Sequence, residues 1–253
     1  MSLIQRVVRW CYPYGAARLV WRGPVSGMRF RVVNGMGATY ALGIDTADMR
    51  LLTPKIRPGM VVWDVGSNCG QLALFFSRQV GETGQVYCFE PVPENHAKLA
   101  ENLRLNGLTH VETFQTALGA DERPRAFIFD PARHTMGTFP DTMVKLKDHE
   151  GTITVPCTTL DAWAEDRPAP SLIKIDVEGA GLEVIEGAAR VIGRHRPGIF
   201  FEVHAEEAGA AELQALVMLR ERWGYRVDDL SGTLGGGYGP LWRAAVWCEP
   251  PQS

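Results

Sequence analysis

The stretch V-V-W-D-V-G-S-N-C-G, from Val61 to Gly70, decides the fold, and Y-C-F-E-P, from Tyr87 to Pro91, follows it. An apolar run ends in a glycine-containing turn before the apolar helical pattern of residues 72–80, which predicts a strand, a tight turn and a helix. The two glycines of the turn let the backbone approach a ligand, and the helix N-terminus there offers free N–H groups. Glu90 ends the next apolar strand, where a carboxylate can bind both hydroxyls of a ribose. Together these features predict a site for an adenosine-type cofactor.

The turn also indicates which adenosine cofactor is bound. A dinucleotide site has the pattern G-x-G-x-x-G, whereas here Asn68 replaces the middle glycine and Asp64 precedes the turn. We expect the Asp64 carboxylate at the mouth of the turn, where it would repel a pyrophosphate but suit a ligand with ammonium and sulfonium charges. S-adenosylmethionine (SAM) is such a ligand. The turn therefore favours SAM, and an NAD-dependent oxidoreductase is the least favoured alternative.

Composition bounds the class of protein. The chain has 253 residues, 45% hydrophobic and 22% charged, which is typical of one large α/β domain. The five cysteines are scattered without C-x-x-C spacing, so neither a disulfide framework nor a zinc site is indicated. The sequence shows no membrane-spanning run and no secretory signal pattern, so we expect a cytoplasmic protein.

The N-terminal segment is basic. The first 44 residues carry six arginines and no acidic residue, which leaves a net charge of −9 on the remainder. Apolar residues between Leu3 and Cys11 recur at helical spacing. One interpretation is that this arm rests as an amphipathic helix on an anionic membrane or attracts a phosphorylated substrate. The interpretation that we favour is that the arm packs on its own domain or on a second subunit of a homo-oligomer. Nucleic acid is not expected as a partner, because the aromatic residues of the arm belong to no recognisable binding module.

The rest of the chain predicts strands that alternate with helices, and hence a mostly parallel seven-stranded sheet with helices on both faces. Strands are expected at 60–65, 85–90, 111–117, 171–177, 198–203, 225–230 and 242–249, and helices at 70–80, 93–106, 182–192 and 210–223. Strand-like runs at 126–129 and 153–155 indicate a hairpin or lid inserted at 121–156. A further hairpin is expected at 27–37. We expect residues 1–57 to form an arm and hairpin packed on a main domain at 58–253.

Polar residues follow two strands in the second half of the chain. Asp176 and Glu178 come at the end of L-I-K-I-D-V-E-G, and Glu202 and His204 at the end of F-F-E-V-H. Because ligands of open α/β sheets bind outside the carboxyl ends of the strands, we expect these side chains to line the same crevice as the glycine turn. Glu178 precedes a helix and can equally be a cap or scaffold, whereas Asp176 at the strand tip is the stronger functional candidate.

With these motifs in their order and spacing, residues 58 to 204 resemble the FkbM-type methyltransferases, a SAM-dependent family that acts mainly on hydroxyl groups. The matching motifs are P-G-M-V-V-W-D-V-G-S-N-C-G, V-Y-C-F-E-P-V-P-E-N, N-L-R-L-N, A-L-G, T-T-L-D and L-I-K-I-D-V-E-G-A followed by E-V-I-E-G-A. The resemblance implies a Rossmann-like class I methyltransferase fold.

The resemblance also implies roles for single residues. The methionine part of SAM would lie against Asp64 and the turn, the ribose against Glu90, and the adenine beside the strand that ends at Ala117. The residues expected to bind the cofactor are Asp64, Gly66, Ser67, Asn68, Gly70, Glu90, Pro91, Thr116 and Ala117. One position departs from the family: where an acidic residue is usual, this chain has Gly181. The role of that acid is then lost here or passed to Glu183.

The chemistry expected is transfer of a methyl group to a hydroxyl, which needs a nucleophile in line with the methyl carbon and sulfur. Asp176 and His204 are the candidate bases for the hydroxyl proton. Alternatively, Asp176 and Glu202 hold a divalent cation that acidifies the hydroxyl. The leading function is methylation of a sugar hydroxyl in a glycan, glycolipid or glycosylated natural product. The alternatives are a non-sugar hydroxyl or an amine of a small metabolite or peptide, and a SAM-binding protein without catalysis.

Overall fold

The computed structural model of the chain describes residues 10, 13, 15–31, 47–129, 137–138, 151–204, 209–232 and 243–251. The helix expected in the basic arm and the glycine-rich loop at Gly235 to Gly239 lie outside these residues, apart from the isolated Trp10. None of the helices in the described part of the chain is long and apolar enough to cross a membrane.

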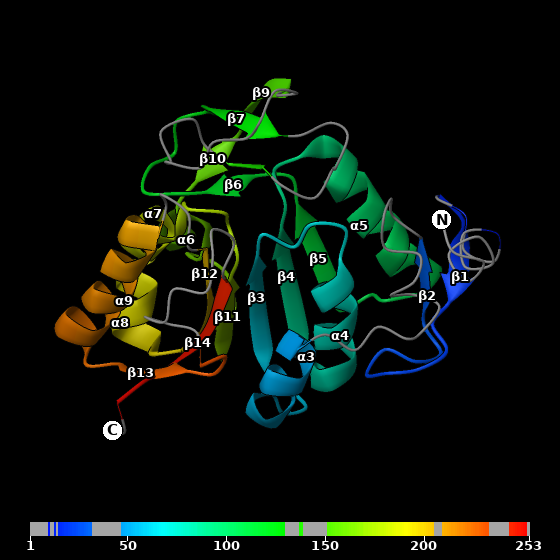
Figure 1. Cartoon of the computed structure of the whole chain (residues 1–253), viewed down its shortest axis with the longest axis horizontal. Coiled ribbons are helices and arrows are strands. Elements are labelled where there is room, and N and C mark those ends of the chain that lie inside the picture. Colours follow the sequence, from blue (N-terminus) through cyan, green and yellow to red (C-terminus); the bar gives the residue numbers. More distant parts are fainter. Residues whose placement is uncertain are drawn as a thin grey trace.

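A seven-stranded sheet forms the centre of the described structure, in the order β13-β14-β12-β11-β3-β4-β5 (Figure 1). Five neighbouring strands run parallel, and β14 is antiparallel to both of its neighbours. The strands are β3 (Val61–Val65), β4 (Gln85–Phe89), β5 (Val111–Phe114), β11 (Leu172–Ile175), β12 (Gly198–His204), β13 (Arg226–Asp229) and β14 (Arg243–Glu249). The chain order reverses between β3 and β11, which is where an open α/β sheet forms its ligand crevice. The expected seven-stranded, mostly parallel sheet is confirmed.

Helices cover both faces of the sheet, as the alternating sequence predicts. One apolar core joins the sheet to α3 (Ala47–Leu52), α4 (Gln71–Val80) and α5 (Pro93–Leu105). The second core joins the opposite face to α6 (Leu160–Trp163), α7 (Gly181–Glu186), α8 (Ala189–His195) and α9 (Gly209–Trp223). Figure 1 shows α4 and α5 on one side of the sheet and α7, α8 and α9 on the other. The short helices α3 and α6 and the 3-10 turn η1 (Thr53–Lys55) were not predicted.

Two predicted elements are divided in the structure. The helix expected at 182–192 is broken between α7 and α8 at Gly187, where a Cβ would lie 2.0 Å from the Gly119 carbonyl oxygen, so only glycine fits at the break. The strand expected at 111–117 ends with β5 at Phe114. The chain then continues as β6 (Ala117–Leu118), which leaves the main sheet and pairs in parallel with β10 (Cys157–Thr158).

The inserted hairpin is confirmed and carries one further strand. Strand β7 (Arg125–Phe129) pairs antiparallel with β9 (Gly151–Val155), and β8 (Gly137–Thr138) adds to the other edge of β7. Figure 1 places this small sheet, with β6 and β10 beneath it, beyond the carboxyl ends of the central strands. The insertion therefore lies over the edge of the sheet where the crevice is expected.

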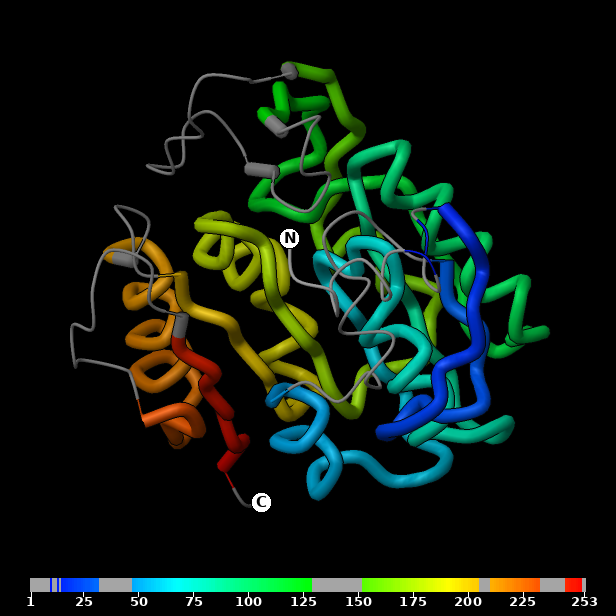
Figure 2. The backbone as a smooth tube through the Cα atoms, turned by 45° about the vertical axis from the view of Figure 1, so that its right-hand side comes forward, coloured from blue at the N-terminus to red at the C-terminus, as the bar shows by residue number. Residues whose placement is uncertain are grey.

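The hairpin expected at 27–37 is described only as far as Arg31, because residues 32–37 lie outside the described part of the chain. Within the described part, strand β2 (Arg29–Arg31) pairs antiparallel with the upstream β1 (Ala17–Leu19) and forms a hairpin earlier in the chain. The backbone N–H groups of Arg29 and Arg31 donate to the side-chain oxygens of Asn106 and Asn102 at 2.7 and 2.8 Å. These bonds tie the hairpin to α5, beside which the blue strands run in Figure 2.

Candidate active site

A cleft of about 650 Å³ opens at the carboxyl ends of β3, β4 and β11. Eight of the residues predicted to form the site line this cleft, namely Gly66, Asn68, Glu90, Pro91, Thr116, Ala117, Asp176 and Glu178. Four further predicted residues, Ser67, Gly70, Glu202 and His204, lie near the cleft without lining it. The structure thus brings the two halves of the predicted site to one edge of the sheet.

The turn after β3 has a backbone shape that its sequence requires. Gly66 has φ +79°, and a Cβ there would lie 1.9 Å from the carbonyl oxygen of Asp176. Only glycine permits this approach, which holds the cofactor turn against the end of β11. Asn68 also adopts a left-handed conformation, with φ 50°, which asparagine tolerates better than most residues. The two halves of the site are therefore in backbone contact.

Glu90 lies at the end of β4 and is 5% exposed. Its carboxylate accepts hydrogen bonds from the backbone N–H groups of Asn68, at 2.9 Å, and Val92, at 3.0 Å. Burial raises the pKa of Glu90 to about 7, against the lowering effect of these bonds. The residue expected to bind the ribose is thus fixed by the turn it faces.

The side of the cleft where we expect the adenine contains residues that the sequence did not reveal. Phe127 of the inserted sheet, Val92, Asn95 and Leu118 line the cleft beside Thr116 and Ala117. Phe127 is 8% exposed and packs with Ala117 and Val92 in a small apolar cluster. The sequence predicted a strand at 126–129, but nothing in this run showed that Phe127 would line the cleft. The insertion therefore forms one wall of the cofactor cleft.

Lys174 is the most consequential residue missed in the sequence. It is a lone lysine in the apolar strand β11, 2% exposed, and its ammonium donates to the carbonyl oxygen of Gly66 at 2.7 Å. It forms ion pairs with Asp64, at 3.2 Å, and Asp176, at 3.6 Å. Burial alone would lower the pKa of Lys174, but the surrounding carboxylates outweigh it and raise the pKa above its ordinary value. A charged lysine therefore links the cofactor turn to the acidic residues after β11.

Asp64 is placed differently from our expectation. Its side chain is 0% exposed and does not line the cleft, so it is not at the mouth of the turn. Its neighbour of opposite charge is Lys174, and neither carboxylate oxygen has a hydrogen-bond partner of good geometry among the described residues. Alternation along β3 explains the error: Trp63 and Val65 face one core, so Asp64 faces the opposite side of the sheet beneath the turn. The role expected for Asp64 toward the ammonium group of the cofactor stays a prediction.

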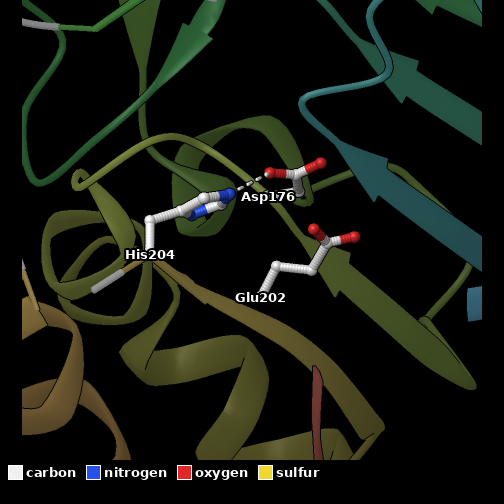
Figure 3. A group of neighbouring side chains, drawn as sticks. All are labelled: Asp176, Glu202 and His204. Carbon is white, nitrogen blue, oxygen red and sulfur yellow. Dashed lines mark ion pairs between the residues drawn. The ribbon is translucent and has the colours of Figure 1, made fainter. Parts of the chain in front are cut away.

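Asp176, Glu202 and His204 converge at the ends of β11 and β12 (Figure 3). Glu202 and His204 are two residues apart in β12 and therefore share a face of the strand. His204 Nε2 lies 3.4 Å from Asp176 Oδ1, and Glu202 is 2% exposed. Of the three, only Asp176 lines the cleft.

Carboxylates surround His204 on both ring nitrogens. Its Nδ1 lies 3.8 Å from Glu212 of α9, its Nε2 3.7 Å from Glu178, and its backbone N–H donates to Glu212. Burial would lower the pKa of His204, but the carboxylates of Glu212, Asp176 and Glu178 around its ring outweigh burial and raise the pKa to about 10. At neutral pH this imidazole therefore carries two protons and is a cation between three carboxylates.

Glu212 also holds the turn that carries Glu178. It is 0% exposed and accepts a hydrogen bond from the Gly179 N–H at 2.8 Å. Glu178 itself has φ 47°, an uncommon conformation for a residue with a long side chain. Glu212 was not predicted, because its partner Gly179 lies 33 residues away and no local pattern in its own helix marks it.

The structure explains the departure at Gly181. A Cβ at this position would lie 2.3 Å from Cζ of Phe201, whose ring is fully buried under the start of α7. The acidic residue usual in the family cannot be accommodated against that ring. Glu183 does not take its place in the cleft, because its carboxylate forms an ion pair with Arg125 of the inserted sheet. Glu183 thus attaches the insertion to α7.

The donor set at His204 bears on the divalent cation. One ligand atom from each of Asp176, Glu202 and His204 lies within 4.8 Å of the others, and two carboxylates with an imidazole are a donor set for several divalent metals. A metal would require His204 to lose a proton. It would also share Asp176 with the Lys174 ammonium 3.6 Å away. The geometry therefore admits a divalent cation, but the protonated His204 and the Lys174 ammonium would compete with it for the carboxylates.

Known proteins resemble this chain in sequence and in fold. Residues 64–227 match the model of the methyltransferase FkbM domain. A hexuronic acid methyltransferase, AglP, of Haloferax volcanii is 28% identical over 166 residues, which cover 62% of this chain and 61% of the relative. The 2-O-methyltransferase NoeI of Sinorhizobium fredii is 28% identical over 155 residues, covering 55% of this chain and 62% of the relative. The chain thus spans about three-fifths of the length of these curated relatives.

A solved structure carries the same fold. The crystal structure of methyltransferase FkbM from Methylobacillus flagellatus superposes with a TM-score of 0.52 at 15% identity, covering 84% of this chain and 52% of that chain. The match of the family model extends from β3 to β13 and includes the cofactor turn, Glu90 and the residues after β11 and β12. The chain belongs to the FkbM methyltransferase family.

Proposed function

We propose that this protein is a SAM-dependent O-methyltransferase whose acceptor is a sugar hydroxyl. The observation that carries the proposal is that Glu90, the glycine turn and Asp176 all line one cleft. The name of one curated relative, a hexuronic acid methyltransferase, supports a sugar acceptor, and the name of the other, a 2-O-methyltransferase, supports transfer to oxygen.

In the proposed reaction SAM supplies a methyl group on a sulfonium, and the bond from sulfur to carbon breaks as the bond from the sugar oxygen to carbon forms. Asp176 accepts the hydroxyl proton, since it is the predicted base that lines the cleft. His204, 3.4 Å from Asp176 Oδ1, orients that carboxylate. The products are the methyl ether and S-adenosylhomocysteine. A positioned base of this kind contributes about 10²–10⁴-fold to the rate.

A second version of the mechanism uses a divalent cation. Asp176, Glu202 and His204 would hold it, and it would lower the pKa of the acceptor hydroxyl. The two versions separate in one assay: in the cation version EDTA abolishes turnover and Mg²⁺ restores it, whereas in the version without metal EDTA has no effect.

The experiment for the function uses SAM with a labelled methyl group, the purified protein and two sets of acceptors. The first set contains hexuronic acids, hexosides and glycolipids, and the second contains non-sugar alcohols, amines and peptides. We expect label in the sugar set, and mass spectrometry of the product locates it on one ring oxygen. Label confined to the second set would contradict the sugar acceptor. Binding of SAM without transfer to any acceptor, or to any fraction of a cell extract, would contradict catalysis.

A further inference from the structure

The hairpin of β1 and β2 is fixed to the domain by its inner residues. Val20, Val25 and Phe30 are at most 1% exposed and belong to the apolar core that also contains residues of α4 and α5. Arg78 of α4 donates to the carbonyl oxygen of Ser26, in the turn of the hairpin, at 2.6 Å. The hairpin is therefore a packed part of the domain, and the side chains on its outer face are held at the surface.

The outer face of the hairpin is both apolar and cationic. Because side chains alternate along a strand, Leu19 and Trp21 point away from the core in which the valine between them is buried. Leu19 is 43% exposed and Trp21 is 68% exposed. Exposed arginines flank these two side chains, namely Arg18 and Arg22 along the chain and Arg29, which lies opposite Leu19 in the ladder with β2. Figure 1 shows β1 and β2 at the margin of the molecule, on the far side of α5 from the sheet.

The charge of this face is of one sign. Residues 15–31 contain no acidic residue, and the carboxylate of Glu101 on α5, beside the hairpin, is paired with Arg31. Of the five large apolar side chains that are exposed in the described part of the chain, three lie in the basic N-terminal segment: Trp10, Leu19 and Trp21. Tryptophan is enriched at the headgroup level of bilayers, and arginine is attracted to anionic lipids. The hairpin therefore matches an anionic membrane surface both in its charge and in its exposed apolar side chains.

We propose that the outer face of this hairpin docks on an anionic phospholipid bilayer. Trp21 and Leu19 enter the headgroup region, and Arg18, Arg22 and Arg29 lie against lipid phosphates. Packing of the hairpin on its own domain is compatible with this docking, because packing uses the inner side chains and docking uses the outer ones. The inference goes beyond the proposed function, since it concerns the surface at which the protein works and holds for any acceptor.

The test measures co-sedimentation of the full chain with two kinds of vesicle, one of phosphatidylcholine alone and one of phosphatidylcholine and phosphatidylglycerol in equal parts. The proteins are the wild type, Trp21→Ala, the double variant Arg22→Gln with Arg29→Gln, and a matched control. The control is the double variant Leu213→Ala with Val217→Ala, which removes two apolar side chains of α9 that are 41% and 42% exposed. It separates loss of this face from loss of exposed apolar surface in general.

The wild type should bind the vesicles that contain phosphatidylglycerol and should not bind phosphatidylcholine alone. Trp21→Ala should bind about tenfold more weakly, because the burial of its ring is lost. The double arginine variant should bind about 25-fold more weakly, at about fivefold for each arginine near an anionic surface. The α9 control should bind as the wild type does. Raising the salt concentration from about 0.1 M to about 1 M should release the wild type, because it screens the arginines from the lipids.

Three results would overturn the proposal: no binding of the wild type to either vesicle, equal binding to both, or the same loss in the α9 control as in Trp21→Ala. A fourth is a dimer in sedimentation velocity without lipid that Trp21→Ala dissociates, because a second copy of the chain would then cover this face. The arginine variant keeps the test open should Trp21→Ala fail to fold, since it leaves the apolar side chains of the hairpin in place. Vesicle binding requires neither SAM nor an acceptor, so its outcome is independent of the proposed function.

Discussion

The two halves of the candidate site are built in different ways. The cofactor half, formed by the turn after β3 and by Glu90, depends on backbone N–H groups and on one carboxylate that they hold in place. The charged half, formed by Asp176, Glu178, Glu202, His204 and Glu212, consists of side chains that hold one another. We therefore expect the cofactor half to tolerate changes of charge better than the charged half, in which the position of each side chain depends on its charged neighbours.

Lys174 is the element common to both halves. Its ammonium bonds to the carbonyl oxygen of Gly66 in the cofactor turn and pairs with Asp176 in the charged half. A change at this residue should therefore affect both, whereas changes elsewhere should affect one. The predictions that follow use this distinction, from the largest expected effect to the smallest.

Substitution of Asp176 by Asn should give the largest effect. The variant keeps the size of the side chain but cannot accept the hydroxyl proton, so turnover should fall by about 10²–10⁴-fold. Methyl transfer at saturating SAM measures it. The matched control is Glu178→Gln in the same turn, whose turnover should change by less than about tenfold if Glu178 orders the turn and takes no proton. Unchanged turnover in Asp176→Asn would remove this residue from the chemistry.

Substitution of Lys174 by Met should destabilise the whole domain. It leaves Asp64 fully buried without a cation, and breaking a buried pair in this way costs about 3–5 kcal/mol. Urea denaturation measures the free energy of unfolding. The double variant Lys174→Met with Asp64→Asn should regain a large part of the loss, because the fully buried charge of Asp64 is then removed together with its cation. A loss below about 1 kcal/mol in the single variant would show that Lys174 does not neutralise Asp64.

Substitution of Gly181 by Ala sets two effects against each other. Alanine favours a helix over glycine by about 0.5–1 kcal/mol, but the new Cβ would lie 2.3 Å from the buried ring of Phe201. We expect the collision to prevail and the protein to lose about 1–3 kcal/mol of unfolding free energy. Adding Phe201→Leu should reverse the sign of the alanine effect, since the contact is then gone. A more stable Gly181→Ala single variant would contradict the packing described here.

The pH dependence of SAM binding should be the smallest of these effects. Burial raises the pKa of Glu90 to about 7, and only the ionised form offers charge-assisted acceptors to the ribose. Affinity should thus be highest above pH 7 and fall about three- to tenfold as the carboxyl is protonated below it. Titration calorimetry from about pH 8.5 to about pH 6 measures this, with Glu90→Gln as the control in which only the titration of the cofactor itself remains. An equal slope in both proteins would exclude Glu90 as the cause.

The sequence predicted the sheet, its cofactor turn and the strand ends that carry the site, because these have local signals. The roles of Gly66 and Glu90 could be predicted, because a tight turn requires a glycine and the end of the next strand is where a ribose-binding carboxylate is expected. Lys174 and Glu212 were missed because their roles depend on partners far along the chain, Gly66 for the first and Gly179 for the second. Asp64 was expected at the mouth of the turn, and its burial could not be predicted because its environment is set by the layers above and below the sheet.

The insertion shows the same limit. Its pairing followed from two short strand-like runs, but the contact of Phe127 with the cofactor cleft depends on where the small sheet lies over the domain. The ion pair between Arg125 and Glu183 fixes that position, and no local pattern predicts it.

The separation of the two halves is tested most directly by comparing Glu90→Gln with Asp176→Asn in SAM affinity and in saturated turnover. Glu90→Gln should bind SAM about tenfold more weakly and transfer methyl groups at nearly the wild-type rate once SAM is saturating. Asp176→Asn should bind SAM within a few-fold of the wild type and lose turnover. Parallel loss of affinity and turnover in both variants would contradict the account, because the two halves would then act as one unit.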